Sequence, residues 1–259
     1  MRWGSQVFVT AMFWTIAVAG NVAVGQIKGR VTLARMPALE AGRPVTKNPA
    51  LCGSLLVDES LVIGKKLELK NAVVFLANVR PDTLPPVDVT LAISKCALRP
   101  RVAALLAGDR LVIENRDATL HHARGYLHRF RPGWQGVVTR DIFEEQAASL
   151  FNFAFPTAGA VAVDTLRQPG VLEIRSEIGY DGMRAWVLVL PHRFFTLTNE
   201  NGEFTLDNVP PGQFDMVLWH ERLGVMRQLV EVVRGRKTEL ALVWESSGPA
   251  TAPADSLSP

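Results

Sequence analysis

Short runs in which apolar and polar residues alternate recur along the chain and predict β-strands. Helical periodicity is rare by comparison. Turns containing Gly, Pro, Asn or Asp separate most of these runs, which is typical of all-β sandwich folds. The predicted strands cover residues 26–34, 61–63, 72–76, 88–93, 102–106, 111–113, 151–155, 161–163, 171–174, 185–190, 195–198, 203–206, 214–219, 229–233 and 238–243.

The segments between these strands differ in character. Residues 35–58 contain three prolines without clear periodicity and predict an irregular crossing segment. Residues 80–87 contain three more prolines, which interrupt sheet hydrogen bonding and suit a linker. Residues 123–150 are the least regular part of the middle region, with a short helix expected near residues 141–150. The strand 185–190 is apolar at every position, which predicts a strand covered on both faces.

The N-terminus has the layout of a secretory signal peptide. Arg2 precedes an apolar run over residues 7–19, and Ala23 and Gly25 are the small residues expected before a cut at Gln26. A retained membrane anchor is the alternative, although the run is shorter than the roughly 20 residues that span a bilayer. Residues 1–25 are therefore predicted to be a signal peptide, and the mature protein to be periplasmic or secreted and not membrane-spanning. At the other end, the Ser-, Pro- and Ala-rich residues 246–259 predict a disordered tail.

Charge and cysteine content narrow the function. The 28 basic and 25 acidic residues nearly balance, and no basic run is interleaved with aromatics, so nucleic acid is not an expected partner. Cys52 and Cys96 are the only cysteines. In an exported chain this pair predicts a disulfide, which would contribute about 4 kcal/mol by closing its loop. Two buried free thiols are the alternative.

Two family resemblances follow from longer motifs. Residues 198–214 read Thr-Asn-Glu-Asn-Gly-Glu-Phe-Thr-Leu-Asp-Asn-Val-Pro-Pro-Gly-Gln-Phe, and Gly29-Arg-Val31 lies in the first strand. This pattern resembles the carboxypeptidase regulatory-like domain, a transthyretin-like β-sandwich. The resemblance implies that one sandwich is formed from residues 26–86 and 192–245.

Residues 87–191 resemble a cupredoxin domain, a Greek-key β-sandwich, inserted into the first one. The resemblance lies in Ala-Gly-Asp-Arg-Leu-Val-Ile-Glu-Asn-Arg-Asp-Ala-Thr-Leu-His-His, residues 107–122, and in Gln-Pro-Gly-Val-Leu-Glu-Ile-Arg, residues 168–175. A similar two-part layout occurs in exported bacterial proteins described as methylamine utilisation or plastocyanin-like proteins. The cupredoxin resemblance implies a copper ligand at His121 and further ligands in the loop that follows residue 175.

That loop departs from the family pattern. Cupredoxins carry Cys, His and Met there, whereas this chain has Ser176 at the Cys position and Gly179 or Tyr180 at the His position. Only His121 and Met183 remain as residual metal ligands. Type 1 copper requires two imidazoles and a thiolate with a weak axial thioether, so no bound cofactor is predicted.

Three functions remain open. The favoured prediction is a non-enzymatic binding or assembly module for a periplasmic or cell-envelope protein, contacted through residues 123–150. A copper-binding or electron-transfer protein is the second, with an unusual site formed by His121, His122, His128 and Met183. The third is a carbohydrate-binding module that offers polysaccharide the exposed aromatic rings of Tyr126, Trp134 and Trp186. If Cys52 or Cys96 were a free thiol within bonding distance of His121, an electron carrier would become the favoured function.

The polar residues near the two motifs give little evidence for a catalytic or metal site. Adjacent strand residues point to opposite faces, so at most one of His121 and His122 faces inward. Glu173, Glu177 and Asp181 are expected to be solvated loop charges, and Ser176 lacks the setting of a nucleophile. No catalytic residues are therefore predicted.

Overall fold

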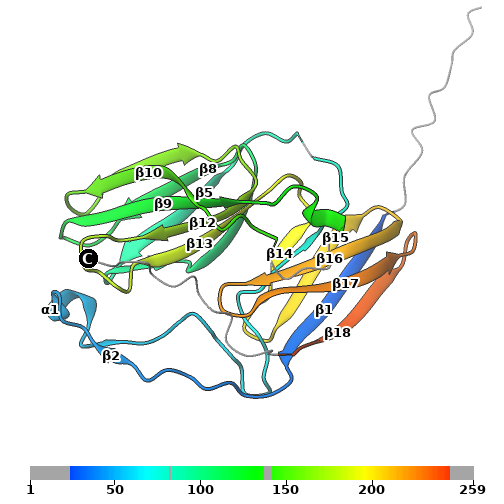
Figure 1. Cartoon of the computed structure of the whole chain (residues 1–259), viewed down its shortest axis with the longest axis horizontal. Coiled ribbons are helices and arrows are strands. Elements are labelled where there is room, and N and C mark those ends of the chain that lie inside the picture. Colours follow the sequence, from blue (N-terminus) through cyan, green and yellow to red (C-terminus); the bar gives the residue numbers. More distant parts are fainter. Residues whose placement is uncertain (1–23, 82, 137–141, 246–259) are drawn as a thin grey trace, which may run out of the picture.

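The computed structural model describes residues 24–81, 83–136 and 142–245, which form an almost entirely β structure of two adjacent β-sandwiches (Figure 1). The predicted all-β fold is confirmed. The elements are β1 (Gly25–Leu33), β2 (Arg43–Pro44), α1 (Pro49–Cys52), β3 (Leu55–Leu56), β4 (Val73–Leu76), β5 (Asp88–Ser94), β6 (Ala97–Arg99), β7 (Val102–Leu106), β8 (Arg110–Asn115), β9 (His121–Arg129), the 3₁₀ turn η1 (Trp134–Gly136), β10 (Ala148–Phe155), β11 (Val161–Thr165), β12 (Gly170–Arg175), β13 (Arg184–Leu190), β14 (Phe195–Leu197), β15 (Glu203–Val209), β16 (Gly212–His220), β17 (Gly224–Val232) and β18 (Lys237–Trp244).

The first sandwich combines the two ends of the chain. One sheet has the strand order β15-β1-β18, with β1 antiparallel to β15 and parallel to β18, and the other has the order β14-β4-β16-β17. Ile27, Val31 and Leu33 of β1 point into the core, as their spacing predicts. Val74 and Leu76 of β4 meet them from the facing sheet.

The second sandwich is continuous in sequence. Its larger sheet has the order β10-β9-β12-β13-β7 and its smaller sheet the order β11-β8-β5-β6. Two strand pairs, β7 with β13 and β5 with β8, are parallel. The parallel pairs show that the chain crosses between sheets, because hairpins alone give antiparallel neighbours.

β9 is the longest strand that the sequence pattern missed. Its inward residues include Ala123 and Gly125, so the alternation carries little apolar signal. A Cβ at Gly125 would lie 2.6 Å from the Phe151 ring, so the small residue makes room for the neighbouring strand. The expected helix near residues 141–150 is also wrong where the structure describes it, because β10 begins at Ala148. Residues 61–63 form only an isolated bridge rather than a strand.

A third apolar cluster joins the two sandwiches. Val73 and Phe75 on the outer face of β4, with Val217 of β16, pack with Leu188 and Leu190 of β13. Because Ala185, Val187 and Val189 fill the second core, β13 is buried on both faces, as predicted. The two sandwiches therefore share a buried apolar interface.

Aromatic side chains of residues 130–134 and of Phe143 close one side of this interface. The Phe130 ring stacks on Trp134 at 4.4 Å and on Phe143 at 4.9 Å, and Trp134 lies 5.8 Å from Phe75. Trp134 is only 7% exposed. The expectation of an irregular excursion over residues 123–150 is wrong where β9 and β10 form, and these aromatic rings pack within the chain. Contact of this region with a partner stays a prediction.

The segment 35–60, called the arm below, leaves β1 and runs to the end of the second sandwich before returning (Figure 1). It carries the β2–β3 hairpin and α1. Cys52 in α1 is bonded to Cys96 in the β5–β6 turn, with Cα atoms 5.1 Å apart, and this confirms the predicted disulfide.

The two terminal predictions fall on residues that the structure does not describe. These are residues 1–23 of the predicted signal peptide and the tail 246–259. Within the described ranges, no helix is long and apolar enough to cross a bilayer.

Candidate functional site

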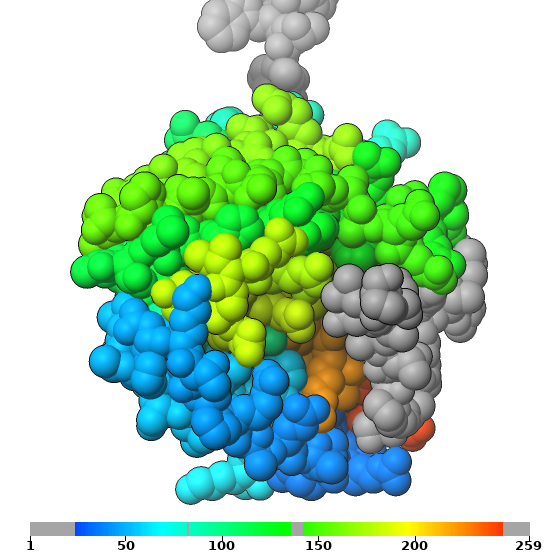
Figure 2. Space-filling view, turned by 60° about the vertical axis from the view of Figure 1, so that its left-hand side comes forward, coloured from blue at the N-terminus to red at the C-terminus, as the bar shows by residue number. Residues whose placement is uncertain are grey.

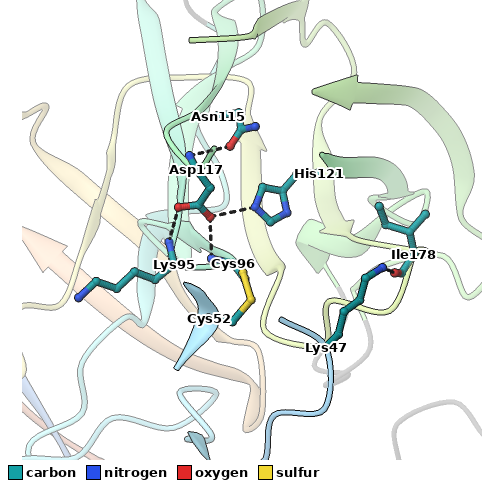
Figure 3. Close-up of a disulfide and its surroundings, with 8 residues drawn as sticks. All are labelled: Lys47, Cys52, Lys95, Cys96, Asn115, Asp117, His121 and Ile178. Carbon is teal, nitrogen blue, oxygen red and sulfur yellow. Dashed lines mark hydrogen bonds and ion pairs between the residues drawn. A yellow bond between two sulfur atoms is a disulfide. The ribbon is translucent and has the colours of Figure 1, made fainter. Parts of the chain in front are cut away.

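A buried carboxylate, Asp117, organises the end of the second sandwich to which the arm is bonded (Figure 3). Its Oδ1 accepts the Lys95 backbone N–H and its Oδ2 accepts that of Cys96, each at 2.8 Å. Lys95 and Cys96 both have positive φ, so the β5–β6 turn has a tight, left-handed backbone. The carboxylate fixes this turn by capping both of its amides.

His121 contacts the same carboxylate from the first position of β9. Its side chain is fully buried, and its Nε2 lies 2.9 Å from Asp117 Oδ2. A carboxylate accepts hydrogen bonds, so Nε2 is the donor in this contact; in the neutral form of the ring the lone pair is then on Nδ1. Nδ1 is buried and has no hydrogen-bond partner among the described residues. Such an unpartnered buried atom calls for an explanation.

The loop after β12 closes over this imidazole. Ser176 N donates to Met183 O at 3.1 Å, and Met183 N donates to Tyr180 O at 2.9 Å. The Tyr180 ring meets the His121 ring edge-on at 4.7 Å. Met183 is fully buried in the same core cluster. Tyr180, one of the two residues expected at a ligand position, thus supplies an aromatic wall beside His121.

The arm covers this loop from outside (Figure 3). Lys47 places its ammonium 4.4 Å from the Tyr180 ring centre and donates to Ile178 O. Leu51 packs against the second core beside the disulfide. A Cβ at Gly182 would lie 3.1 Å from the Leu56 side chain, so the arm approaches the loop closely.

The donor set does not fit type 1 copper. Among the described residues, one group of three possible ligands lies close together: Cys96, Asp117 and His121 have ligand atoms within 4.8 Å of one another. The Cys96 sulfur is bonded to Cys52, so no thiolate is available. One imidazole and one carboxylate lack the second imidazole and the thiolate that this copper site needs.

The other predicted ligands lie elsewhere. His122 points to the opposite face of β9 from His121, as predicted, and contacts Asn152. His128 shares that outer face and its Nδ1 contacts Glu144 O at 3.1 Å. The unusual site of His121, His122, His128 and Met183 is therefore not formed. Ser176 Oγ accepts the Ile178 N–H within its own loop.

A groove of about 2160 Å³ separates the arm from the two sandwiches. Figure 2 shows the arm, in blue, below the green strands of the second sandwich on this side of the molecule. Its wall on the second sandwich comes from the outer face of β9, β12 and β13, and the β16–β17 end of the first sandwich completes it. The aromatic and apolar lining includes Tyr126, Phe143, Val171, Tyr180, Trp186 and Trp219.

The aromatic rings proposed for carbohydrate binding are occupied. Trp134 is buried at the interface between the sandwiches. The Tyr126 ring centre lies 5.2 Å from the guanidinium carbon of Arg124 and 4.6 Å from that of Arg175. Trp186 packs 5.8 Å from Trp219. The expectation of exposed, flat aromatic faces is therefore wrong for Trp134, and the other two rings already have partners.

A buried ion pair locks the sandwiches together beside the groove. Arg101, before β7, binds Glu221 of the first sandwich through two contacts of 2.7 Å. Trp186 Nε1 donates to the same carboxylate at 2.9 Å. Burial raises the pKa of Glu221, while Arg101 opposes that rise. The preceding His220 is so deeply buried that its pKa falls to about 3. Glu221 thus joins the two sandwiches.

Sequence reasoning overlooked Asp117 as the organising residue. The signal available was the Asn115-Arg-Asp117 turn, in which Asn115 Oδ1 accepts the Asp117 N–H at 2.9 Å. An Asx turn of this kind is readable from sequence. The proximity of Asp117 to Cys96 is not, because it depends on the packing of two strands.

Comparisons with known proteins add limited information. No family model matches the chain, and no curated protein matches it. Among solved structures, a purple cupredoxin from Nitrosopumilus maritimus is 13% identical and covers 40% of this chain and 100% of its own, with a TM-score of 0.29. A reduced amicyanin mutant is 17% identical, with coverages of 45% and 98% and a TM-score of 0.29. A copper-containing nitrite reductase from Thermus scotoductus is 15% identical, with coverages of 45% and 26% and a TM-score of 0.28. At these scores none of the likenesses decides function.

Proposed function

We propose that this protein is an exported, non-enzymatic binding or assembly module. In this proposal a cupredoxin-like sandwich is inserted in a transthyretin-like sandwich and serves as a scaffold instead of an electron carrier. The disulfide supports export, because such bonds persist in oxidising compartments. The predicted signal peptide at residues 1–25 points the same way.

One observation carries the proposal: the Cys96 sulfur, the Asp117 carboxylate and His121 Nε2 are committed to structural contacts. Asp117 caps a turn and holds His121, and the Cys96 sulfur is covalently bonded to the arm. The arm and Tyr180 cover the imidazole on the side of the ligand loop. His121 therefore has a structural role: through Asp117, it connects the start of β9 to the β5–β6 turn.

The groove is the proposed binding surface. Basic and acidic residues line it in equal numbers, eight of each, and its floor is aromatic and aliphatic. A groove that binds a polyanion is expected to be lined mainly by basic residues. A mixed lining with aromatic side chains suits a polypeptide segment, since interface cores are rich in aromatic residues and Arg. The partner is thus proposed to be an envelope protein that inserts such a segment.

Copper titration tests the scaffold role. The oxidised protein, mixed with Cu²⁺, is expected to show no intense visible absorption from thiolate-to-copper charge transfer. His121→Phe should leave that spectrum unchanged. An intense band that disappears in the variant would refute the scaffold role and restore an electron-transfer function.

Site-specific photocrosslinking tests the groove. A photoreactive amino acid replaces Arg184, an exposed lining residue, or Val163, an exposed residue of β11 outside the groove. In the native envelope, the first position is expected to yield one defined crosslinked protein and the second none. Equal products from both positions, or none from either, would contradict the assignment of the groove.

A further inference from the structure

We propose that Cys96, Asp117 and His121 form a latent site for a thiophilic metal ion of the Zn²⁺ class, which opens when the Cys52–Cys96 disulfide is reduced. This site differs from the predicted His121–Met183 pair, because its sulfur comes from the β5–β6 turn. It does not depend on the groove having a partner. The arm would thus be a redox-sensitive cover over a metal site.

The ligand atoms are already close together. One atom from each of the three residues lies within 4.8 Å of the other two, and the residues are 4%, 5% and 0% exposed. Zinc bonds to sulfur, nitrogen and oxygen of about 2.0–2.3 Å place tetrahedral ligands roughly 3.5 Å apart. The atoms therefore need to converge by only about 1 Å, which is within the reach of side-chain torsions.

His121 contributes its Nε2 atom to this cluster. The His121 ring has a fully buried nitrogen, Nδ1, without a hydrogen-bond partner among the described residues. Its other nitrogen shares a proton with Asp117. An ion in the cluster would replace that shared proton at Nε2, because Nδ1 points away from Asp117; the carboxylate already fixes the position of the ring.

Reduction releases the correct sulfur. Cys52 and Cys96 both line the groove, and Cys52 is the less buried of the two. A dithiol reductant attacks through its thiolate at Cys52 Sγ, the S–S bond breaks, and Cys96 leaves as the thiolate. The second thiol of the reductant then displaces Cys52, so the reductant ends as a disulfide and the protein gains two electrons. The released Cys96 thiolate stays beside His121 and binds the ion, and the displaced protons leave to solvent.

The donor set selects the ion. One thiolate, one imidazole and one carboxylate are all ligands that Zn²⁺ accepts, and three protein ligands leave a fourth position for water from the groove. The single imidazole does not meet the requirement of a type 1 copper site. Hard ions such as Mg²⁺ and Ca²⁺ prefer oxygen ligands alone and should not compete.

Two single-thiol variants provide the matched test. Cys52→Ser frees Cys96, Cys96→Ser frees Cys52, and neither variant can form the disulfide. Zn²⁺ affinity is measured by competition with a chromophoric chelator, and Co²⁺ is used as the spectroscopic probe. Cys52→Ser is expected to bind one Zn²⁺ at least about 100-fold more tightly than Cys96→Ser, because even outer-shell changes cost up to that factor. Only Cys52→Ser should show thiolate-to-cobalt absorption.

Wild-type protein provides a second measurement that needs no substitution. After reduction with a phosphine it should bind Zn²⁺ as Cys52→Ser does, and reoxidation should release the ion. Adding His121→Gln to Cys52→Ser should weaken binding to the level of Cys96→Ser, with circular dichroism confirming that the fold persists. Equal affinity in the two single-thiol variants, or reduced wild type that binds no more tightly than oxidised protein, would overturn the proposal.

Discussion

Replacing the buried Asp117 by Ala should destabilise the second sandwich more than deletion of an exposed carboxylate does. The substitution removes an acceptor from three donors: the Lys95 and Cys96 amides and His121 Nε2. Lys95 is exposed, so water can satisfy its amide after the change. Cys96 and His121 are buried and keep unsatisfied donors.

The magnitude follows from those two donors. Each buried donor left without a partner costs about 1–3 kcal/mol, so we expect the free energy of unfolding to fall by about 2–6 kcal/mol. Asp117→Asn should cost less than Asp117→Ala, because the amide oxygen still accepts one donor. The NH₂ group of the introduced asparagine, however, is a donor and would face one of the donors whose hydrogen bond Asp117 now accepts.

Guanidinium denaturation under oxidising conditions measures this loss. The matched control is Asp88→Ala, which removes an exposed carboxylate whose side chain is 47% exposed and paired with Arg110. That exposed pair should contribute no more than about 1 kcal/mol. If Asp117→Ala costs as little as the control, Asp117 does not organise the site and His121 is not held by it.

Three further changes test other parts of the structure by denaturation. Glu221→Gln should lower the free energy of unfolding by about 3–5 kcal/mol, because it leaves Arg101 charged and buried at the interface between the sandwiches. The control Glu59→Gln, at an exposed ion pair, should lower it by about 1 kcal/mol or less. Similar losses in the two variants would show that the buried pair does not hold the sandwiches together. Acidification from about pH 6.5 to about pH 3 should lower the free energy of unfolding, because His220 takes up a proton in the unfolded protein but stays neutral in the folded one, where its pKa is about 3. The contribution of His220 to stability is complete above its unfolded pKa. His220→Gln should make the stability less dependent on pH over this range. Gly125→Ala should cost about 1–3 kcal/mol by crowding the Phe151 ring, and an unchanged midpoint would show that the ring moves freely.

Alternation was a good guide to strands whose inward residues are large. β1, β5 and β16 follow directly from apolar residues at every second position. The strand β13 was recognisable as doubly covered because its apolar run is uninterrupted. What covers its outer face was not predictable, since the cover comes from β4 and β16, far away in sequence.

The interior of β9 shows the opposite limit. Its inward side chains are His121, Ala123, Gly125 and Leu127, and only the last is large and apolar. The aromatic side chains of β10 fill the space that Gly125 leaves, so the apolar signal belongs to the neighbouring strand. A pattern read along one strand cannot register packing that is supplied across the sheet.

The candidate site was predictable in part. The loop after β12 lacks a Cys and a His, and this is visible in the sequence. The sequence also offered Cys52 and Cys96 as a disulfide pair. It gave no sign that Cys96 lies within 4.8 Å of His121, because the two residues approach only when the β5–β6 turn packs beside the start of β9. A free thiol near His121 would have favoured an electron carrier. The Cys96 sulfur does lie near His121, but it is bonded to Cys52 of the arm.

The arm couples the groove to the cluster of Cys96, Asp117 and His121. Its ion pairs are Glu59 with Arg99, which is exposed, and Asp58 with Arg222, which is half-buried; an exposed pair contributes at most about 1 kcal/mol. The disulfide closes a loop with a sequence separation of 44, and such a loop is worth about 4 kcal/mol. Reduction therefore removes the largest single constraint on the arm. A partner that requires the closed groove must favour the oxidised protein, whereas an ion at Cys96 must favour the reduced protein. By linkage, each ligand should weaken the binding of the other.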